Sequence, residues 1–176
     1  MKPKLNKPRR QNSLRLKGYD YSQPGAYFVT TVTHQRECLF GEIENDVIRL
    51  NNAGKIVRTV WLGLPQYYAH IELGAFIIMP NHAHGVIIIN DAVGAGLRPA
   101  PTKPQKQHGL SEIMRAFKSF SSRRIHEHDE FSPEKIWQRG FHDRIIRNED
   151  EWSRIHLYIE TNPINWQEDH DNPINL

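Results

Sequence analysis

The sequence predicts an α+β protein in which helices pack on a mainly antiparallel sheet. Segments with the period of two that strands show are interspersed with segments that have the helical period. Two of the strand segments are separated only by a turn, so we expect them to pair antiparallel. At 176 residues, the chain is long enough to form one domain with a sizeable core.

Strand and helix signals follow one another in the first part of the chain. Aromatic and β-branched residues alternate along 26–33, which predicts the first strand. Residues 39–43 and 47–50 follow as a small hairpin around an Asn-Asp turn. A helix is predicted over 52–67, and apolar residues spaced by four mark its inner face. These residues are Ile56, Val60 and Leu64.

The centre of the sheet is predicted at two β-branched runs, 71–79 and 84–89, which meet at a Pro-Asn turn. Residues 86–89 are apolar at every position, which indicates a strand buried on both faces. The segment 91–109 is rich in Gly, Ala, Pro and Lys and lacks periodicity, so it is predicted to be a flexible loop.

A second helix is predicted over 110–128 and a short strand over 141–146. The residues predicted to face inward from the second helix are Leu110, Ile113, Phe117 and Phe120. The last helix begins at Asn148, because Asn148 and Glu151 have the spacing of a capping box. It ends before Pro163, since the residue before a proline avoids the α region.

The last helix presents two neighbouring rows of side chains. Trp152, Ile155 and Ile159 have the spacing of a core stripe. Tyr158 and Asn162 are four residues apart beside that stripe, so they point the same way. The alternative for these two is a half-buried aromatic residue and an ordinary residue at a helix end.

His82 and His84 are candidate metal ligands. Side chains two apart on a strand point to the same face, so the two imidazoles can converge on one cation. An oxygen of Asn162 is a candidate third ligand. The alternative is a structural histidine pair at the end of a strand.

Tyr158 is a candidate nucleophile for a phosphodiester. A tyrosine hydroxyl with a pKa of about 10 is almost fully protonated at neutral pH, so it needs a base, a nearby cation or a metal to attack. Arg154, one turn earlier, is placed to supply positive charge. A surface ion pair of Arg154 with Asp150 or Glu151 is the alternative.

Composition narrows the class of protein without deciding it. The single cysteine, Cys38, excludes a disulfide scaffold and a cysteine-rich zinc site within the chain. No apolar run is long enough to span a bilayer and no signal peptide is seen, so a cytoplasmic location is expected. Residues 1–17 are predicted to be a basic, flexible arm, and 167–176 an acidic tail that avoids nucleic acid.

Basic residues in two segments and on the last helix are candidate contacts to DNA phosphates. They are Arg9, Arg10, Arg15 and Lys17 in the arm, Arg115, Lys118, Arg123 and Arg124 in the second helix, and Arg154. For the arm, the alternative is a solvated tail.

Four blocks of the sequence resemble the HUH single-tyrosine transposases, in particular the REP-associated tyrosine transposases of bacteria. The blocks are GYDYSQPGAYFVT at 18–30, MPNHAHG at 79–85, IWQRGFHDRIIRN at 136–148 and YIETNP at 158–163. They occur in the family's order, and the resemblance extends from residue 9 to 166. Members of the family often have His where this chain has Arg144.

The resemblance implies a ferredoxin-like HUH core spanning 18–166. It implies that His82 and His84 bind a divalent metal, Mg²⁺ or Mn²⁺, that Asn162 completes the ligand set, and that Tyr158 is the nucleophile. The expected activity is cleavage and rejoining of single-stranded DNA at hairpin-forming repeats, through a covalent phosphotyrosine, at the bacterial nucleoid.

Two other functions and several details stay open at this point. A metal-dependent phosphodiesterase would use water in place of Tyr158, and a nucleic-acid-binding module would not cleave at all. The sequence also leaves open a homodimer, and whether Tyr158 serves its own active site or a partner's.

Overall fold

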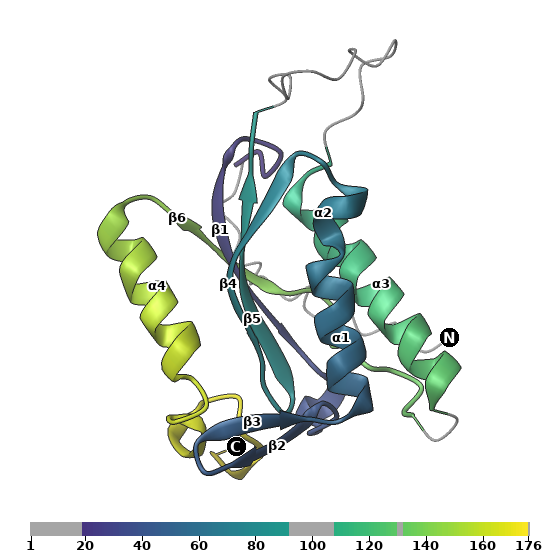
Figure 1. The fold of residues 1–176 in the computed structure, drawn as a ribbon. Helices are drawn as coiled ribbons and strands as arrows, with labels where there is room; N and C mark the ends of the chain where they lie inside the picture. The colour runs from purple at the N-terminus through teal and green to yellow at the C-terminus, as the bar shows by residue number, and fades with distance from the viewer. Residues whose placement is uncertain (1–18, 92–107, 130–131, 176) are drawn as a thin grey trace, which may run out of the picture.

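The computed structural model describes residues 19–91, 108–129 and 132–175 (Figure 1). The arm 1–17 and most of the loop 91–109 lie outside this part of the chain. The strands are β1 Gly25–Val32, β2 Gly41–Glu44, β3 Val47–Leu50, β4 Ile71–Ile78, β5 His82–Ile89 and β6 His142–Ile146. The helices are α1 Asn52–Leu62, α2 Leu64–Tyr67, α3 Leu110–His128 and α4 Glu149–Thr161, with short 3₁₀ turns at His34–Arg36, Trp166–Glu168 and Pro173–Asn175.

The main sheet has the strand order β4-β5-β1-β6, and all its neighbours pair antiparallel. The connection between β4 and β5 is a tight turn, as the sequence predicts. Strand β5 pairs on both sides, so Thr30 of β1 lies opposite His84 and Val32 lies opposite His82. The predicted α+β architecture and central strand pair are confirmed.

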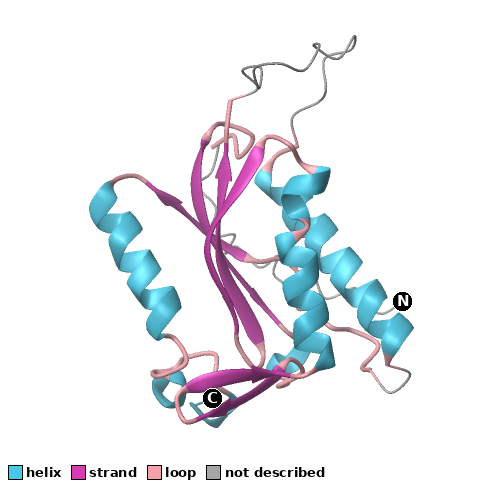
Figure 2. Ribbon diagram, viewed as in Figure 1, coloured by secondary structure: helices cyan, strands magenta, loops and turns pink. Residues whose placement is uncertain are grey.

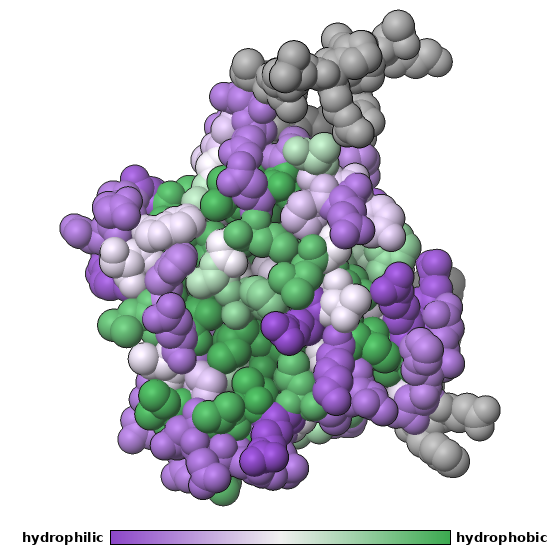
Figure 3. All heavy atoms as spheres, in the orientation of Figure 1, coloured by the Kyte–Doolittle hydropathy of each residue, from purple (hydrophilic) through white to green (hydrophobic). Residues whose placement is uncertain are grey.

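Helices cover both faces of the sheet (Figures 1 and 2). The larger core cluster lies between the sheet and helices α1 and α3, and includes Val57, Trp61, Phe117 and Ile87. The smaller cluster joins Val86 to Ile155 and Ile159 of α4. Hydrophobic side chains are visible along the middle of this view, between the hydrophilic outer surfaces of the helices (Figure 3).

Alternate side chains of strand β5 point to opposite faces of the sheet. Ala83, Ile87 and Ile89 belong to the larger core, while Val86 belongs to the α4 cluster. Gly85 lies on the larger core's side, where a Cβ atom would come within 2.3 Å of the Trp61 ring. The indole therefore fills the space that a side chain at Gly85 would need.

The prediction of one continuous helix over 52–67 is wrong in one respect, because the observed helix is interrupted at Gly63, which separates α1 from α2. Pro65 lies in the first turn of α2, where its missing N–H costs no helical hydrogen bond. Val60 and Leu64 are buried as predicted, whereas Ile56 is only partly buried and Val57 and Trp61 occupy the core.

The predicted inner face of α3 is correct except at Phe120, which is 42 % exposed. Ser121 is fully buried in its place. Its hydroxyl donates to the Phe117 carbonyl and accepts a hydrogen bond of 2.9 Å from the Trp137 indole N–H. These two hydrogen bonds satisfy the hydroxyl and allow a polar residue in the core.

Helix α4 begins as predicted, since the Asn148 side chain accepts a hydrogen bond of 2.8 Å from the Glu151 N–H. The Glu151 carboxylate turns to the Arg147 N–H instead of the cap residue. The core stripe is confirmed, with Ile155 and Ile159 buried and Trp152 packed beside them. Within the described ranges, we find no helix with the length and apolar character needed to cross a bilayer.

Candidate active site

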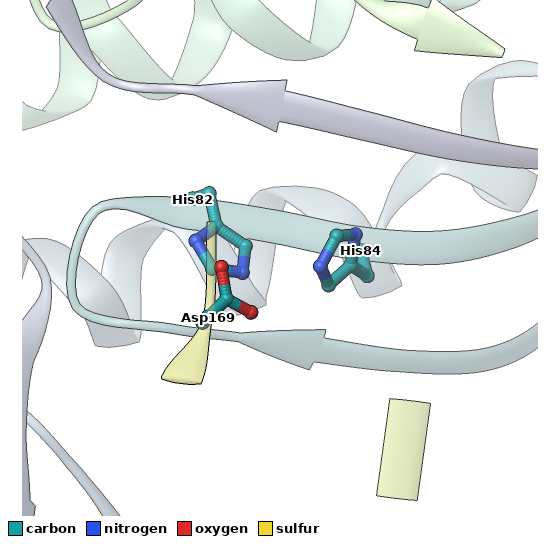
Figure 4. A group of neighbouring side chains, drawn as sticks. All are labelled: His82, His84 and Asp169. Carbon is teal, nitrogen blue, oxygen red and sulfur yellow. The ribbon is translucent and has the colours of Figure 1, made fainter. Parts of the chain in front are cut away.

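The predicted histidine pair lies at the start of β5, on the face that α4 covers. His82 and His84 are both buried, and their ring centroids are 4.5 Å apart. The prediction that they share one strand face is confirmed. Figure 4 shows the Asp169 carboxylate, which comes from the C-terminal segment, beside the His82 ring.

The orientation of His82 is fixed by the residue before it. The Asn81 amide nitrogen donates to the backbone carbonyls of Arg36 (3.0 Å) and Asp171 (2.6 Å). The amide oxygen therefore faces His82, at 2.9 Å from Nδ1. Because an amide oxygen only accepts, Nδ1 of His82 must carry a hydrogen, and the neutral ring has a lone pair on Nε2.

The second histidine has a partner at each ring nitrogen. Thr30 Oγ1 lies 2.8 Å from His84 Nδ1, and the Tyr158 hydroxyl lies 3.2 Å from Nε2. When Nδ1 donates to Thr30, Nε2 is free to accept the Tyr158 hydrogen or to bind a cation. This nitrogen cannot do both at once, so metal binding at His84 and the Tyr158 hydrogen bond exclude each other.

Burial favours the neutral form of both imidazoles. It lowers the pKa of His84 well below the ordinary value, and the neighbouring His82 adds to this effect. Burial also lowers the pKa of His82, although the carboxylates of Asp169 and Asp171 oppose it. A neutral imidazole is the form that ligates metals.

Tyr158 projects from α4 toward the histidine pair, as predicted. Its ring lies edge-on to Phe28 at a centroid distance of 6.0 Å, and the residue is 44 % exposed. Burial of the hydroxyl raises the pKa of Tyr158 to about 12, and the charges of Asp169 and Asp171 act in the same direction. The hydroxyl is therefore protonated at neutral pH and needs added positive charge to react.

Asn162 lies one turn beyond Tyr158 and is buried, at the C-terminal end of α4. Its amide nitrogen donates to the Asp169 carboxylate at 3.2 Å. Its Oδ1 atom is buried and has no hydrogen-bond partner among the described residues, and the same is true of Nε2 of His82. Two such orphaned acceptors beside a carboxylate are the lone pairs that a cation would satisfy.

Asp169 is the site residue that sequence reasoning missed. One potential ligand atom from each of His82, His84 and Asp169 lies within 4.8 Å of the others, so the three could hold a metal ion. Two imidazoles, one carboxylate and the Asn162 amide form a mixed nitrogen and oxygen set that fits a divalent cation.

The C-terminal segment positions Asp169. The Asp171 N–H donates to Asp169 Oδ1 at 2.6 Å, and the Asp171 carboxylate forms an ion pair of 2.5 Å with Arg36. The Asp171 carbonyl accepts from Asn81, which orients His82. The predicted acidic tail thus packs against the histidine pair and contributes to the site.

The predicted DNA-contact residues lie in different parts of the molecule. Arg154 is exposed on α4, where its Nε donates to the Asp150 carbonyl. Arg115 is exposed on α3, on the opposite face of the sheet from Tyr158. Lys118 donates to the carbonyls of Gln138 and Gly140, which directs its ammonium group into the protein. Arg9, Arg10, Arg15 and Lys17 lie outside the described residues.

Arg144 is on β6, opposite Phe28. It occupies the position where members of the family that the sequence resembles often have His. It forms an ion pair of 2.7 Å with Glu151 at the start of α4. This pair links the edge strand to the helix that carries Tyr158.

The comparison with solved structures identifies the fold, and the comparison with curated sequences identifies a relative. No protein-family model matches the chain. A solved structure of a REP-associated tyrosine transposase bound to a REP hairpin superposes with a TM-score of 0.59 at 19% sequence identity, covering 84% of this chain and 72% of that one. An uncharacterized protein of Haemophilus influenzae is 36% identical over 166 residues, which are 90% of this chain and 91% of that protein. The chain belongs to one family with the Haemophilus influenzae protein, and it has the fold of a REP-associated tyrosine transposase.

Proposed function

We propose that this protein is a metal-dependent transposase that cleaves and rejoins single-stranded DNA through a covalent phosphotyrosine at Tyr158. The observation that carries the proposal is the 3.2 Å contact between the Tyr158 hydroxyl and His84, which belongs to the His82, His84 and Asp169 group. A nucleophile and a cation site in one place are what phosphodiester cleavage by tyrosine needs. The fold of a REP-associated tyrosine transposase supports the same function.

His82, His84, Asp169 and Asn162 would hold the metal, for which Mg²⁺ or Mn²⁺ is proposed. When bound, the metal supplies positive charge that offsets the anionic phosphate oxygens and favours ionisation of a nearby hydroxyl. The two oxygen ligands are of the kind that Mg²⁺ and Mn²⁺ prefer. The unsatisfied acceptors on His82 and Asn162 support this ligand set.

Tyr158 carries out the covalent step. Its oxygen gives up its proton and forms a bond to phosphorus, the bond from phosphorus to a sugar oxygen breaks, and that oxygen leaves and takes up a proton, so the step consumes no net proton. A DNA hydroxyl rejoins the strand by the reverse reaction and frees Tyr158. The phosphotyrosine conserves the energy of the broken phosphodiester bond, so rejoining the DNA strand needs no nucleoside triphosphate.

The proposed substrate is single-stranded DNA that forms hairpins at repeats. The structural neighbour is bound to a REP hairpin, and we extend that substrate to this chain by analogy of fold. Arg115 and Arg154, with the basic residues of the arm, remain proposed phosphate contacts. Action at the nucleoid, homodimer formation and catalysis across a dimer remain hypotheses as well.

The test is incubation with a labelled hairpin oligonucleotide and Mg²⁺ or Mn²⁺, followed by a denaturing gel. The wild-type protein should form a covalent adduct, and Tyr158→Phe should lower adduct formation below detection, because Phe cannot form the phosphate ester. Stability and DNA affinity should stay almost unchanged, since the ring keeps its packing on Phe28. Tyr19→Phe, a tyrosine that contacts Tyr27 instead of the histidines, is the matched control and should retain full activity.

Other outcomes would point to the other functions. Cleavage without an adduct, in both the wild type and Tyr158→Phe, would make water the nucleophile. DNA binding without cleavage under either metal would leave a nucleic-acid-binding module. Adduct formation by Tyr158→Phe would assign the nucleophile to another residue.

A further inference from the structure

The outer surface of the α1, α2 and α3 layer carries an aromatic groove that the proposed active site does not use. Tyr67 at the end of α2 and Phe120 of α3 are 70% and 42% exposed. Their rings stack on each other, with centroids 6.1 Å apart and planes inclined by 19°. They line a groove of about 330 Å³ together with Leu62, Leu64 and Arg124. Helices α1 and α3 lie side by side here (Figure 1).

Basic side chains border this groove. The Arg123 guanidinium lies over the Phe120 ring at 5.7 Å from its centroid. Arg124 also lines a second hollow that continues between the helices beside Lys55, Thr59 and Glu127. Within the described ranges, no ion pair is formed by Arg123, Arg124 or Lys55.

The sequence of the layer reinforces the positive charge. Helices α1, α2 and α3 contain more basic than acidic residues. The basic residues are Lys55, Arg58, Arg115, Lys118, Arg123 and Arg124, and the acidic residues are Glu112 and Glu127. Exposed aromatic rings beside unpaired guanidinium groups are the elements from which single-stranded nucleic-acid sites are built: bases stack on the rings, and cations track the phosphates.

We propose that this groove binds unpaired nucleotides of the DNA substrate, with a base on the exposed Tyr67 ring, which Phe120 supports from behind, and phosphates at Arg124 and Lys55. The inference rests on the proposed function, because it assigns a second contact to the same DNA. The groove and Tyr158 lie on opposite helical layers, so one strand that reaches both must pass around an edge of the sheet. The preferred substrate is therefore a hairpin with a single-stranded extension, rather than a hairpin alone.

The experiment compares two labelled DNAs, one hairpin without an extension and the same hairpin with an unpaired extension of about 12 nucleotides. Affinities are measured in a Tyr158→Phe background, so that no strand is cut. Tyr67→Ala combined with Phe120→Ala should weaken binding of the extended hairpin about 5- to 150-fold, the range that corresponds to loss of a stacked base. Affinity for the hairpin without an extension should not change.

The matched control combines Val47→Ala with Ile174→Ala, two exposed apolar residues far from the groove in sequence and 60% and 82% exposed. It should leave both affinities unchanged. Arg124→Ala should lower the slope of log affinity against log salt by about 0.7 on the extended hairpin, as expected for one phosphate contact to a single strand. Arg58→Ala, on the same layer but outside the groove lining, should not.

The outcomes separate this inference from the proposed function. Suppose that the wild-type protein forms the Tyr158 adduct and that the aromatic double variant binds the extended hairpin normally. This result refutes the groove as a DNA-binding site and leaves the proposed function intact. An equal loss on both DNAs overturns the assignment of the groove to the single-stranded extension. Failure of the protein with Tyr67 and Phe120 intact to bind either DNA overturns both proposals. As a positive readout, an extension carrying 5-iodouracil should crosslink on illumination to a peptide that contains Tyr67 or Phe120.

Discussion

The two faces of the central sheet differ in what they bury. On the α1 and α3 face, β5 presents Ala83, Ile87 and Ile89 to a large apolar core. On the α4 face, the same strand presents His82 and His84, and the apolar cluster there is smaller. The comparison shows that the residues on one face of a strand can stabilise the fold while the alternate residues, on the other face, form a reactive site.

The helical layers that cover the two faces differ in charge as well. Helix α4 carries one arginine and four acidic residues, whereas six basic and two acidic residues lie on α1, α2 and α3. The carboxylate beside His82 and His84 is that of Asp169, which comes from the C-terminal segment and not from α4. A phosphate backbone gains from the basic side. The proposed groove therefore lies on the helical layer with the excess of basic residues.

The largest expected effect is on stability, and it comes from a change at Gly85 on the sheet face that packs against α1 and α3. Gly85→Ala places a methyl group within 2.3 Å of the Trp61 ring, so the indole or the strand must move. We expect a loss of about 3 kcal/mol in the free energy of unfolding, near the upper end of overpacking effects. Denaturant titration measures it. In a Trp61→Leu background the same change should cost much less, and an equal cost in both backgrounds would refute close packing as the reason for glycine.

On the α4 face, Asp169→Asn should impair metal binding without loss of stability. It removes the one negative charge of the ligand group but keeps an oxygen that can accept from the Asp171 N–H. Mn²⁺ affinity, measured by calorimetry, should fall by at least the roughly 10- to 100-fold that loss of a supporting partner causes. Glu168→Gln makes the same charge change on a neighbouring exposed residue and should have no effect. Unchanged Mn²⁺ affinity in Asp169→Asn would exclude Asp169 as a ligand.

The residues that sequence analysis placed correctly are those that follow a local period. His82 and His84 share a strand face, and Tyr158 and Asn162 share a helix face, because the spacing within each element dictates it. That Tyr158 meets His84 is a tertiary fact, which the family resemblance suggested and residue spacing could not. Asp169 gave no signal, because it lies in an acidic segment without period and reaches the site through a turn.

Helix α3 shows a limit of apolar spacing within an element. Phe120 fits a three-to-four spacing after Phe117, yet Ser121 occupies the buried position. The hydrogen bond from Trp137 to the Ser121 hydroxyl comes from a residue sixteen positions later in the chain. A polar residue whose partner lies outside its own helix cannot be recognised as buried from the helix pattern alone.

A smaller effect is expected from Asn81, which positions His82 without belonging to the ligand group. Asn81→Ala removes the acceptor that holds the hydrogen on Nδ1 of His82. Mn²⁺ affinity should fall about 10-fold, at the low end of the range for such supporting partners. Nitrogen NMR of the imidazole should also show a mixture of tautomers in the variant. A single Nδ1–H tautomer with normal affinity would show that burial alone orients the ring.

The smallest effect is a gain, and it concerns the shared nitrogen of His84. In the structure the Tyr158 hydroxyl occupies His84 Nε2, and metal binding must displace it. Tyr158→Phe removes this competitor, so Mn²⁺ affinity should rise about 2- to 10-fold, as expected from a net hydrogen-bond free energy of about 0.5–1.5 kcal/mol. Thr30→Val acts on the other nitrogen of the same ring, where it removes an orienting partner, and should lower the affinity. Opposite changes in Mn²⁺ affinity for the two variants distinguish competition between Tyr158 and the metal from a general loosening of the His84 ring. A Tyr158→Phe protein with lower Mn²⁺ affinity would indicate that the hydroxyl helps to hold the metal.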